Sequence, residues 1–116
     1  MVRFTVKGQP ISVNLCYRKS RNGMIFMSRE GKAWKALVTL CSKVAMNGSP
    51  PAEGPLVVKI AFFYQSRRND LDGGLKPTLD ALAPFVMKND RQVEEIHLWK
   101  KLDPANPRAE ITVELR

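Results

Sequence analysis

Apolar and polar residues alternate over residues 2–6 at the start of the chain, which is the period of a strand with one buried face. Residues 55–64 are β-branched and aromatic almost throughout, and such a run predicts a central strand. Two later stretches, residues 92–102 and 108–116, place apolar residues at strand spacing and predict two more strands. The apolar positions of these last two strands are Val93, Ile96, Leu98, Leu102, Ile111, Val113 and Leu115.

Two other stretches repeat apolar residues every three or four positions, the spacing of one face of a helix. The first is predicted to run from Ser28 to a stop at residues 47–48. The second is predicted to start near Gly74 or Leu75, because Pro77 fits best close to the start of a helix. The two apolar faces consist of Trp34, Leu37, Val38, Cys41, Val44 and Ala45, and of Leu75, Leu79, Leu82 and Val86.

Between the opening strand and the first helix, Asn22 and Gly23 form a two-residue turn signal that predicts a hairpin. The cationic side chains that mark this segment as a basic hairpin rather than core are Arg18, Lys19, Arg21 and Arg29. The order strand, basic hairpin, helix, strand, helix, strand, strand predicts an α+β fold, with a mixed β-sheet and two main helices packed on it. A length of 116 residues fits a single domain over residues 1–116.

Charge is distributed unevenly along the chain. The net charge is +8, and residues 1–49 hold nine basic residues against one acidic residue, whereas residues 50–116 hold ten of each. We therefore expect the first half to bind a polyanion, with a nucleic acid as the leading partner. An anionic membrane surface is a weaker alternative, because no basic amphipathic helix with exposed aromatic residues stands out. A basic surface that only confers solubility remains open.

The remaining composition predicts a cytoplasmic protein with no membrane partner. No apolar run is long enough to span a bilayer, and the first residues do not resemble a signal peptide. Cys16 and Cys41 have no metal-type spacing and are expected to be reduced thiols.

The sequence RRNDLDGGLKPTLD, residues 67–80, places two aspartates where a strand ends and a helix begins. In extended geometry Asp70 and Asp72 point the same way, so both carboxylates can reach one point. Asp90 lies beyond the helix, and if the flanking strands are neighbours, all three carboxylates converge at one edge of the sheet. Such a cluster repels itself unless it binds a cation, and hard oxygen ligands favour Mg²⁺ or Mn²⁺. The structural alternative is that Asp72 caps the helix and Asp70 is solvated.

Basic residues near this motif suit a reaction at a phosphate group. Lys76 follows Asp72 by one helical turn and would direct its ammonium group at the scissile phosphate. Asp80 comes four residues later and is expected to pair with Lys76 or to orient it. The residues expected to contact DNA are Arg18, Lys19, Arg21, Arg29 and Lys32, together with Arg67 and Arg68 on the flanking backbone.

The longer pattern RRNDLDGGLKPTLDAL, followed by KNDRQV, resembles the RusA family of Holliday-junction resolvases, many of which are carried by prophages. The upstream segments GQPISVNLCYR and GMIFMSREGKAW also resemble that family, so the resemblance covers about residues 9–101. It implies that Asp70, Asp72 and Asp90 form a Mg²⁺ site and that Lys76 is the catalytic lysine. It also implies a small homodimer that introduces paired, symmetric nicks across a four-way DNA junction in recombination and repair.

Two positions depart from the pattern of the family. Gly73 stands where the family usually has an asparagine, whose side chain could orient a carboxylate or cap the helix. Asn89 stands where many members carry a second acid, and we expect it to support the site rather than to bind the metal. Because the three aspartates are present, we expect an active enzyme. The alternatives are a degenerate or non-catalytic nucleic-acid-binding protein that uses the basic half alone, and a nuclease for other branched DNA.

Overall fold

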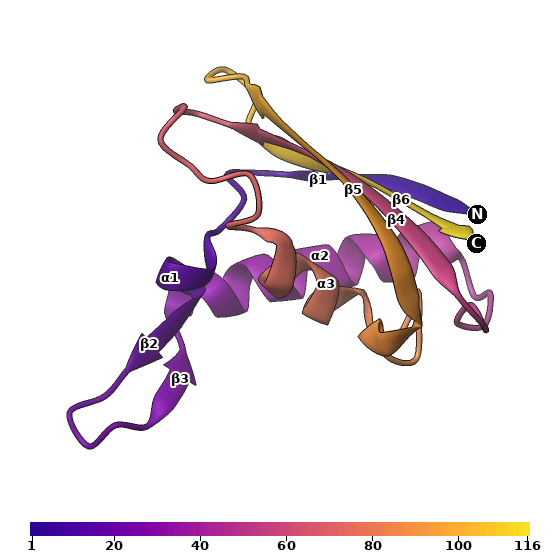
Figure 1. The fold of residues 1–116 in the computed structure, drawn as a ribbon, viewed down its shortest axis with the longest axis horizontal. Coiled ribbons are helices and arrows are strands. Elements are labelled where there is room, and N and C mark those ends of the chain that lie inside the picture. The colour runs from indigo at the N-terminus through magenta and orange to yellow at the C-terminus, as the bar shows by residue number, and fades with distance from the viewer.

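The computed structural model describes all residues 1–116 and has helices on one face of a four-stranded sheet (Figure 1). The predicted α+β class with a mixed sheet is confirmed. A short helix that the apolar pattern did not predict, α1, precedes the hairpin. In chain order the elements are β1 (Val2–Lys7), α1 (Val13–Cys16), β2 (Tyr17–Lys19), β3 (Ile25–Met27), α2 (Arg29–Met46), β4 (Leu56–Tyr64), α3 (Leu75–Leu82), the 3₁₀ turn η1 (Asp90–Gln92), β5 (Val93–Leu102) and β6 (Arg108–Leu115).

The direction of each strand decides where the ends of the sheet lie. The strand order is β1-β6-β4-β5, and β6 runs antiparallel to both β1 and β4. The last pair, β4 and β5, is parallel, because α3 carries the chain back to the starting end of the sheet before β5 begins. Leu56 at the start of β4 therefore pairs with Val93, and Tyr64 at its end pairs with Leu102.

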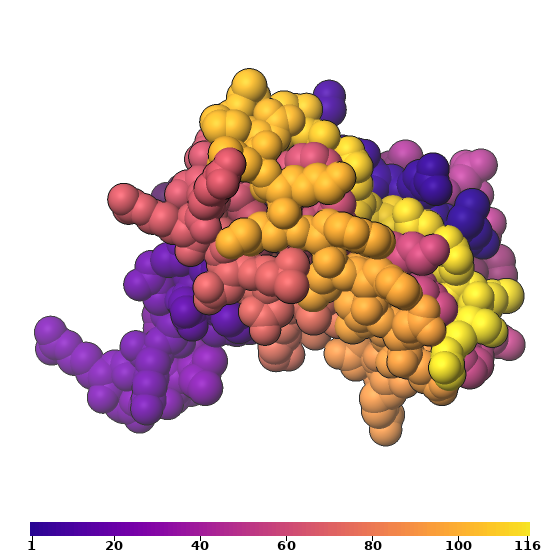
Figure 2. Space-filling view, turned by 45° about the horizontal axis from the view of Figure 1, so that its top comes forward, coloured from indigo at the N-terminus to yellow at the C-terminus, as the bar shows by residue number.

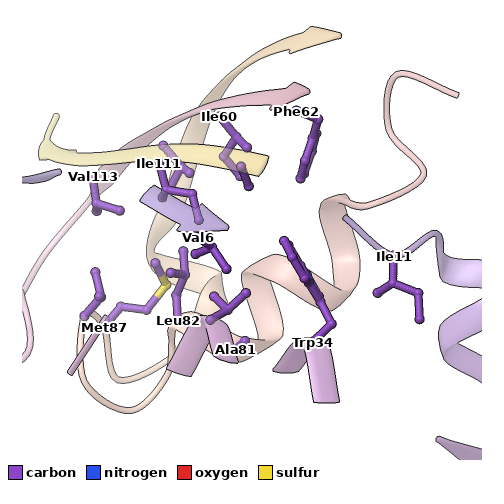
Figure 3. Close-up of a cluster of buried hydrophobic side chains, with 14 of the residues drawn as sticks. Val6, Ile11, Trp34, Ile60, Phe62, Ala81, Leu82, Met87, Ile111 and Val113 are labelled. Atoms are coloured by element: carbon purple, nitrogen blue, oxygen red, sulfur yellow. The ribbon is translucent and has the colours of Figure 1, made fainter. Parts of the chain in front are cut away.

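One hydrophobic core lies between the sheet and helices α2 and α3 (Figure 3). Ile60, Phe62 and Ile111 are fully buried on the sheet side and face Trp34 and Leu82 from the helices. This burial is the main stabilising contribution, since apolar area removed from water yields about 25 cal/mol per Å². The Trp34 indole N–H also donates a 3.1 Å hydrogen bond to the buried Thr78 hydroxyl, which joins α2 to α3.

The predicted ends of α2 are confirmed by its caps. Ser28 is the N-cap and accepts a 3.0 Å hydrogen bond from the Gly31 N–H. Asn47 ends the helix in the left-handed conformation, with φ of 49°. The predicted apolar face is wrong at two positions, because Leu37 and Val44 are 37% and 69% exposed and only part of the helix contacts the sheet.

The apolar positions of the last strands are also more exposed than their spacing suggested. Ile96 and Leu102 of β5 are 38% and 44% exposed, and Leu115 at the end of β6 is 67% exposed. Strand β5 is an edge strand that the helices leave largely uncovered, so its apolar side chains remain in contact with solvent.

Helix α1 and the hairpin are attached to the start of α2 by a close backbone approach at Gly31. A Cβ atom at this position would lie 2.7 Å from both the carbonyl oxygen and the Sγ of Cys16, so only glycine allows the contact. The Ser28 hydroxyl donates a 2.6 Å hydrogen bond to the Leu15 carbonyl at the same place. The base of the hairpin is therefore fixed to the helix layer. None of the helices combines the length and the apolar character that a membrane-spanning segment requires.

Candidate active site

The segment that carries Asp70 and Asp72 is a loop between the end of β4 and the start of α3, and backbone contacts hold it in place. Lys100 on β5 donates hydrogen bonds to the carbonyl oxygens of Arg67 at 3.2 Å and Asn69 at 2.8 Å. On the other side, the Val13 N–H donates to the Gly73 carbonyl at 2.6 Å. The loop thus presents its two carboxylates from a defined position between the sheet and α1.

The start of α3 shows whether Asp72 caps this helix, which is the structural alternative to a role in metal binding. The N-cap of this helix is Gly74, and no side chain caps its backbone. The Leu75 N–H is bonded instead to the carbonyl oxygen of Asp72, at 3.1 Å. The Asp72 carboxylate is therefore not used as a helix cap and remains exposed together with that of Asp70.

Most acidic side chains of this basic protein form ion pairs, but the predicted metal ligands do not. Of the eleven acidic residues, seven lie within 4.0 Å of a cationic side chain, and the remaining four are Glu30, Asp70, Asp72 and Asp90. The chain has nineteen Lys and Arg side chains, yet none of them forms an ion pair with any of the three aspartates. Unpaired carboxylates of this kind are free to bind a metal ion.

The structure separates Asp90 from the other two aspartates within one chain. Asp90 opens the turn η1 just before β5 and therefore lies at the end of the sheet where β4 begins. Asp70 and Asp72 follow β4 at its other end, and the nine residues of β4 alone span about 26 Å at the usual strand rise. The expected convergence of three carboxylates at one edge of a single sheet is wrong, because β4 and β5 are parallel. No three His, Cys, Asp or Glu side chains of the chain are grouped so that they could hold a metal ion.

Asn89 supports the turn that carries Asp90. Its side-chain oxygen accepts a 2.8 Å hydrogen bond from the Arg91 N–H, and Gln92 bonds back to the N–H of Asn89 at 3.1 Å. This reciprocal arrangement is a capping box. It fixes the backbone from which Asp90 extends.

Lys76 belongs to a small polar cluster on α3 and the base of the hairpin. The predicted pair with Asp80 is present, with 3.1 Å between Lys76 Nζ and Asp80 Oδ2. The Tyr17 hydroxyl donates a 2.9 Å hydrogen bond to the same oxygen, and the Lys76 ammonium lies 5.9 Å from the Tyr17 ring centroid. Burial, followed by the hydrogen bond to Asp80, raises the pKa of Tyr17 to about 12, so its hydroxyl stays protonated at neutral pH.

Tyr64 ends β4 beneath the aspartate loop and was not singled out from the sequence. It is 1% exposed, and its hydroxyl has no hydrogen-bond partner. Burial raises the pKa of Tyr64 to about 12; the Gly74 backbone opposes this shift, and the negative charges of Asp70 and Asp72 add to it. A buried polar group without a partner is costly and usually marks a place where a ligand or water completes the structure.

The predicted DNA-contacting residues are all exposed and lie on three elements. The hairpin carries Arg18, Lys19 and Arg21, the start of α2 carries Arg29 and Lys32, and the aspartate loop carries Arg67 and Arg68. Lys100 and Lys101, which the sequence interpretation did not select, line a cavity of about 240 Å³ beside Arg67. Their place near the loop follows from the parallel pairing of β4 and β5, which spacing along the chain does not reveal.

Comparison with known proteins gives one finding at the level of the family. The family model described as Endodeoxyribonuclease RusA matches residues 7–114. A search of individual curated proteins finds no match.

Proposed function

Because this chain belongs to the RusA family of endodeoxyribonucleases, we propose that it resolves four-way DNA junctions by paired, symmetric, Mg²⁺-dependent nicks. Membership in the family implies an endonuclease that binds and resolves Holliday junctions in recombination, and nucleases of this family are generally metal-dependent. The observation that carries the proposal for this chain is that Asp70, Asp72 and Asp90 form no ion pair in a protein of charge +8. Such DNA processing is expected in the cytoplasm.

The donor set fits a hard divalent cation. Asp70 and Asp72 offer unpaired carboxylate oxygens beside the partnerless hydroxyl of Tyr64, and oxygen ligands suit Mg²⁺, with Mn²⁺ as a substitute. We propose that Asp70, Asp72 and Asp90 hold the ion. Bound by these carboxylates, a divalent ion would supply Lewis-acid stabilisation of charge at the phosphate and would make a water molecule there more acidic.

Since Asp90 lies at the opposite end of the sheet, we propose that each site is completed by Asp90 of the partner subunit in a two-fold homodimer. Strand β5 suits such an interface, because it is an exposed edge with partly exposed Ile96 and Trp99. Antiparallel pairing of two β5 strands brings the start of each strand to the end of the other. The start of one β5 then lies near the end of the partner's β4, where the aspartate loop begins.

The charges along β5 are complementary in that antiparallel arrangement. The strand begins with Glu94 and Glu95 and ends with Lys100 and Lys101, so acidic residues of one copy face basic residues of the other. Two-fold symmetry generates two identical sites, which suits symmetric cleavage of two strands of one junction.

The other residues bind the substrate and stabilise charge in this proposal. Lys76, held by Asp80, directs its ammonium at the scissile phosphate and stabilises the negative charge that develops there. Arg67 and Arg68 hold the flanking backbone, and the basic residues of the hairpin and the start of α2 bind phosphates further away.

The test is cleavage of a synthetic four-way junction with and without Mg²⁺, for the wild-type protein and Asp70→Asn. We expect cleavage only with Mg²⁺ and the wild-type protein, whereas Asp70→Asn binds the junction at least as tightly, because a negative charge facing the phosphates is removed. A variant that cuts as fast as the wild type would exclude the assigned site. If neither protein cuts, the chain is a binding protein only; equal cleavage of flap or linear duplex DNA would replace junction resolution by a broader nuclease activity.

A further inference from the structure

The hairpin of β2 and β3 carries three consecutive large apolar side chains that lie mostly in solvent. Met24, Ile25 and Phe26 are 67%, 73% and 51% exposed. The hairpin is a separate two-stranded sheet that projects from the body of the molecule (Figure 1), and it extends as an arm in the space-filling view (Figure 2). A contiguous exposed apolar run on such an arm marks a binding surface.

A cation stands opposite two of the three apolar residues of β3. The register pairs Arg18 with Phe26 and Lys19 with Ile25, and directly paired residues of antiparallel strands share a face. Each face of the hairpin therefore combines an apolar group with a positive charge. The partner that fits this combination is negatively charged and offers apolar flat surfaces. The same hairpin of a second copy is disfavoured as this partner, because it would bring the cations of two hairpins together.

The tip of the hairpin is held in shape by its own hydrogen bonds. The Ser20 N–H donates to the Met24 carbonyl at 2.8 Å, and the Gly23 N–H donates to the Ser20 carbonyl at 3.0 Å. The Ser20 hydroxyl donates to the Asn22 side chain at 2.6 Å. The apolar residues thus sit at the end of an ordered turn, which limits the entropy lost when they bind.

The base of the hairpin adjoins the proposed catalytic lysine. Tyr17, the first residue of β2, bonds Asp80, which in turn holds Lys76. The register places Phe26 and Ile25 one and two residues beyond Tyr17, or about 3–7 Å at strand rise, which is roughly the rise of one or two base pairs. A junction bound at Lys76 therefore brings the bases next to the branch point within reach of Phe26 and Ile25.

From these observations we propose that the hairpin is a wedge that inserts Phe26 and Ile25 between bases at the branch point, while Arg18, Lys19 and Arg21 bind the adjacent phosphates. Apolar side chains that enter base steps beside phosphate-binding cations are a general means of unstacking DNA. Fully stacked linear duplex resists such insertion more than a branch point does, so the wedge selects junctions by shape. This inference rests on the proposed function for its substrate, but it concerns recognition and not cleavage.

The experiment measures unstacking without cleavage. A four-way junction with 2-aminopurine beside the branch point is titrated in EDTA with the wild-type protein, the Ile25→Ala/Phe26→Ala double variant and the control Leu40→Ala, which removes an equally exposed apolar residue from α2. The wild-type and control proteins are expected to raise the fluorescence. The double variant should not, and its preference for the junction over linear duplex should fall about ten-fold, within the contribution of one base–aromatic stack.

Each other outcome would overturn the wedge. Equal fluorescence with the double variant, or no increase with the wild-type protein, excludes base insertion. Loss of binding to anionic phospholipid vesicles in the double variant, with unchanged fluorescence, would assign the surface to a membrane. A change in its sedimentation, with unchanged fluorescence, would assign the surface to a contact between subunits. Because the readout needs no metal, failure of the wedge is separate from failure of cleavage, which the Mg²⁺ assay reports.

Discussion

Asp80 accepts two hydrogen bonds at one oxygen atom, from the Tyr17 hydroxyl at 2.9 Å and from the Lys76 ammonium at 3.1 Å. The position of Lys76 therefore depends on a residue of the hairpin base that is far away in the sequence. The spacing of four residues on a helix predicted the pair between Lys76 and Asp80. It gave no sign of Tyr17, because the contact arises only when α1 and the hairpin pack beside α3.

Tyr17→Phe should slow junction cleavage about three- to ten-fold with little change in DNA binding. The substitution keeps the ring beside Lys76 but removes the hydroxyl, and one hydrogen bond contributes about 0.5–1.5 kcal/mol. The measurement is single-turnover cleavage beside a binding titration. Tyr17→Ala, which also removes the ring, should be slower still; an unchanged rate in Tyr17→Phe would mean that the hydroxyl does not position Lys76.

Among the structural elements, α3 is joined to the aspartate loop by two adjacent glycines, Gly73 and Gly74, which have different surroundings. A Cβ at Gly74 would lie 3.2 Å from the ring of the fully buried Phe62 and 3.3 Å from the Ile11 carbonyl. A Cβ at Gly73 would have no neighbour closer than 3.6 Å. The two glycines thus look equivalent in the sequence, but only the second is required by packing.

Gly74→Ala should lower the free energy of unfolding by about 1–3 kcal/mol, since neither the ring nor the carbonyl can easily give way. The matched control Gly73→Ala should be neutral or raise it by about 0.4–1 kcal/mol, because alanine restricts the unfolded chain. Urea unfolding followed by circular dichroism measures both. A larger loss for Gly73→Ala than for Gly74→Ala would contradict the packing described for this helix start.

In the whole molecule, the distance between Asp90 and the aspartate loop determines whether one chain can form the proposed metal site. The parallel pairing of β4 and β5 puts these groups at opposite ends of one sheet, so a single chain does not assemble the proposed metal site. The unpaired state of all three aspartates and the charge pattern of β5 support a site shared between two copies.

A shared site predicts that two inactive variants restore activity when their subunits are mixed. In a heterodimer of Asp70→Asn and Asp90→Asn, one site carries both substitutions and the other carries neither. Such a mixture should nick one strand of a four-way junction, although each variant alone does not. Nicked and fully resolved products are separated on denaturing and native gels.

The control is a mixture of Asp70→Asn with Asp72→Asn, which should stay inactive because both residues come from the same chain and each site lacks one ligand. If the mixture of Asp70→Asn with Asp90→Asn also stays inactive while subunit exchange is demonstrated, the shared site is wrong.

Features that depend on residues close together in the chain were predictable from the amino-acid sequence. These include the two main helices and the strands of an α+β fold, the Ser28 cap, the turn at Asn22, and the basic first half. They are predictable because caps, turns and apolar periods act within a few residues. The short helix α1 lacked such a signal, since its four residues are held by contacts with α2 and not by their own propensity.

The contacts and separations between residues far apart in the chain became visible only in the folded molecule. It left Ile25 and Phe26 in solvent, exposed the apolar side chains of the edge strand β5, and placed Asp90 far from Asp70. The sequence did contain a partial indication that Asp90 and Asp70 are far apart. Two strands connected by a helix are usually parallel, so the end of one lies beside the end of the next. Local preferences decide whether a residue lies in a helix, a strand or a turn. Which distant residues it contacts depends on the direction of that element and on what covers it in the folded protein.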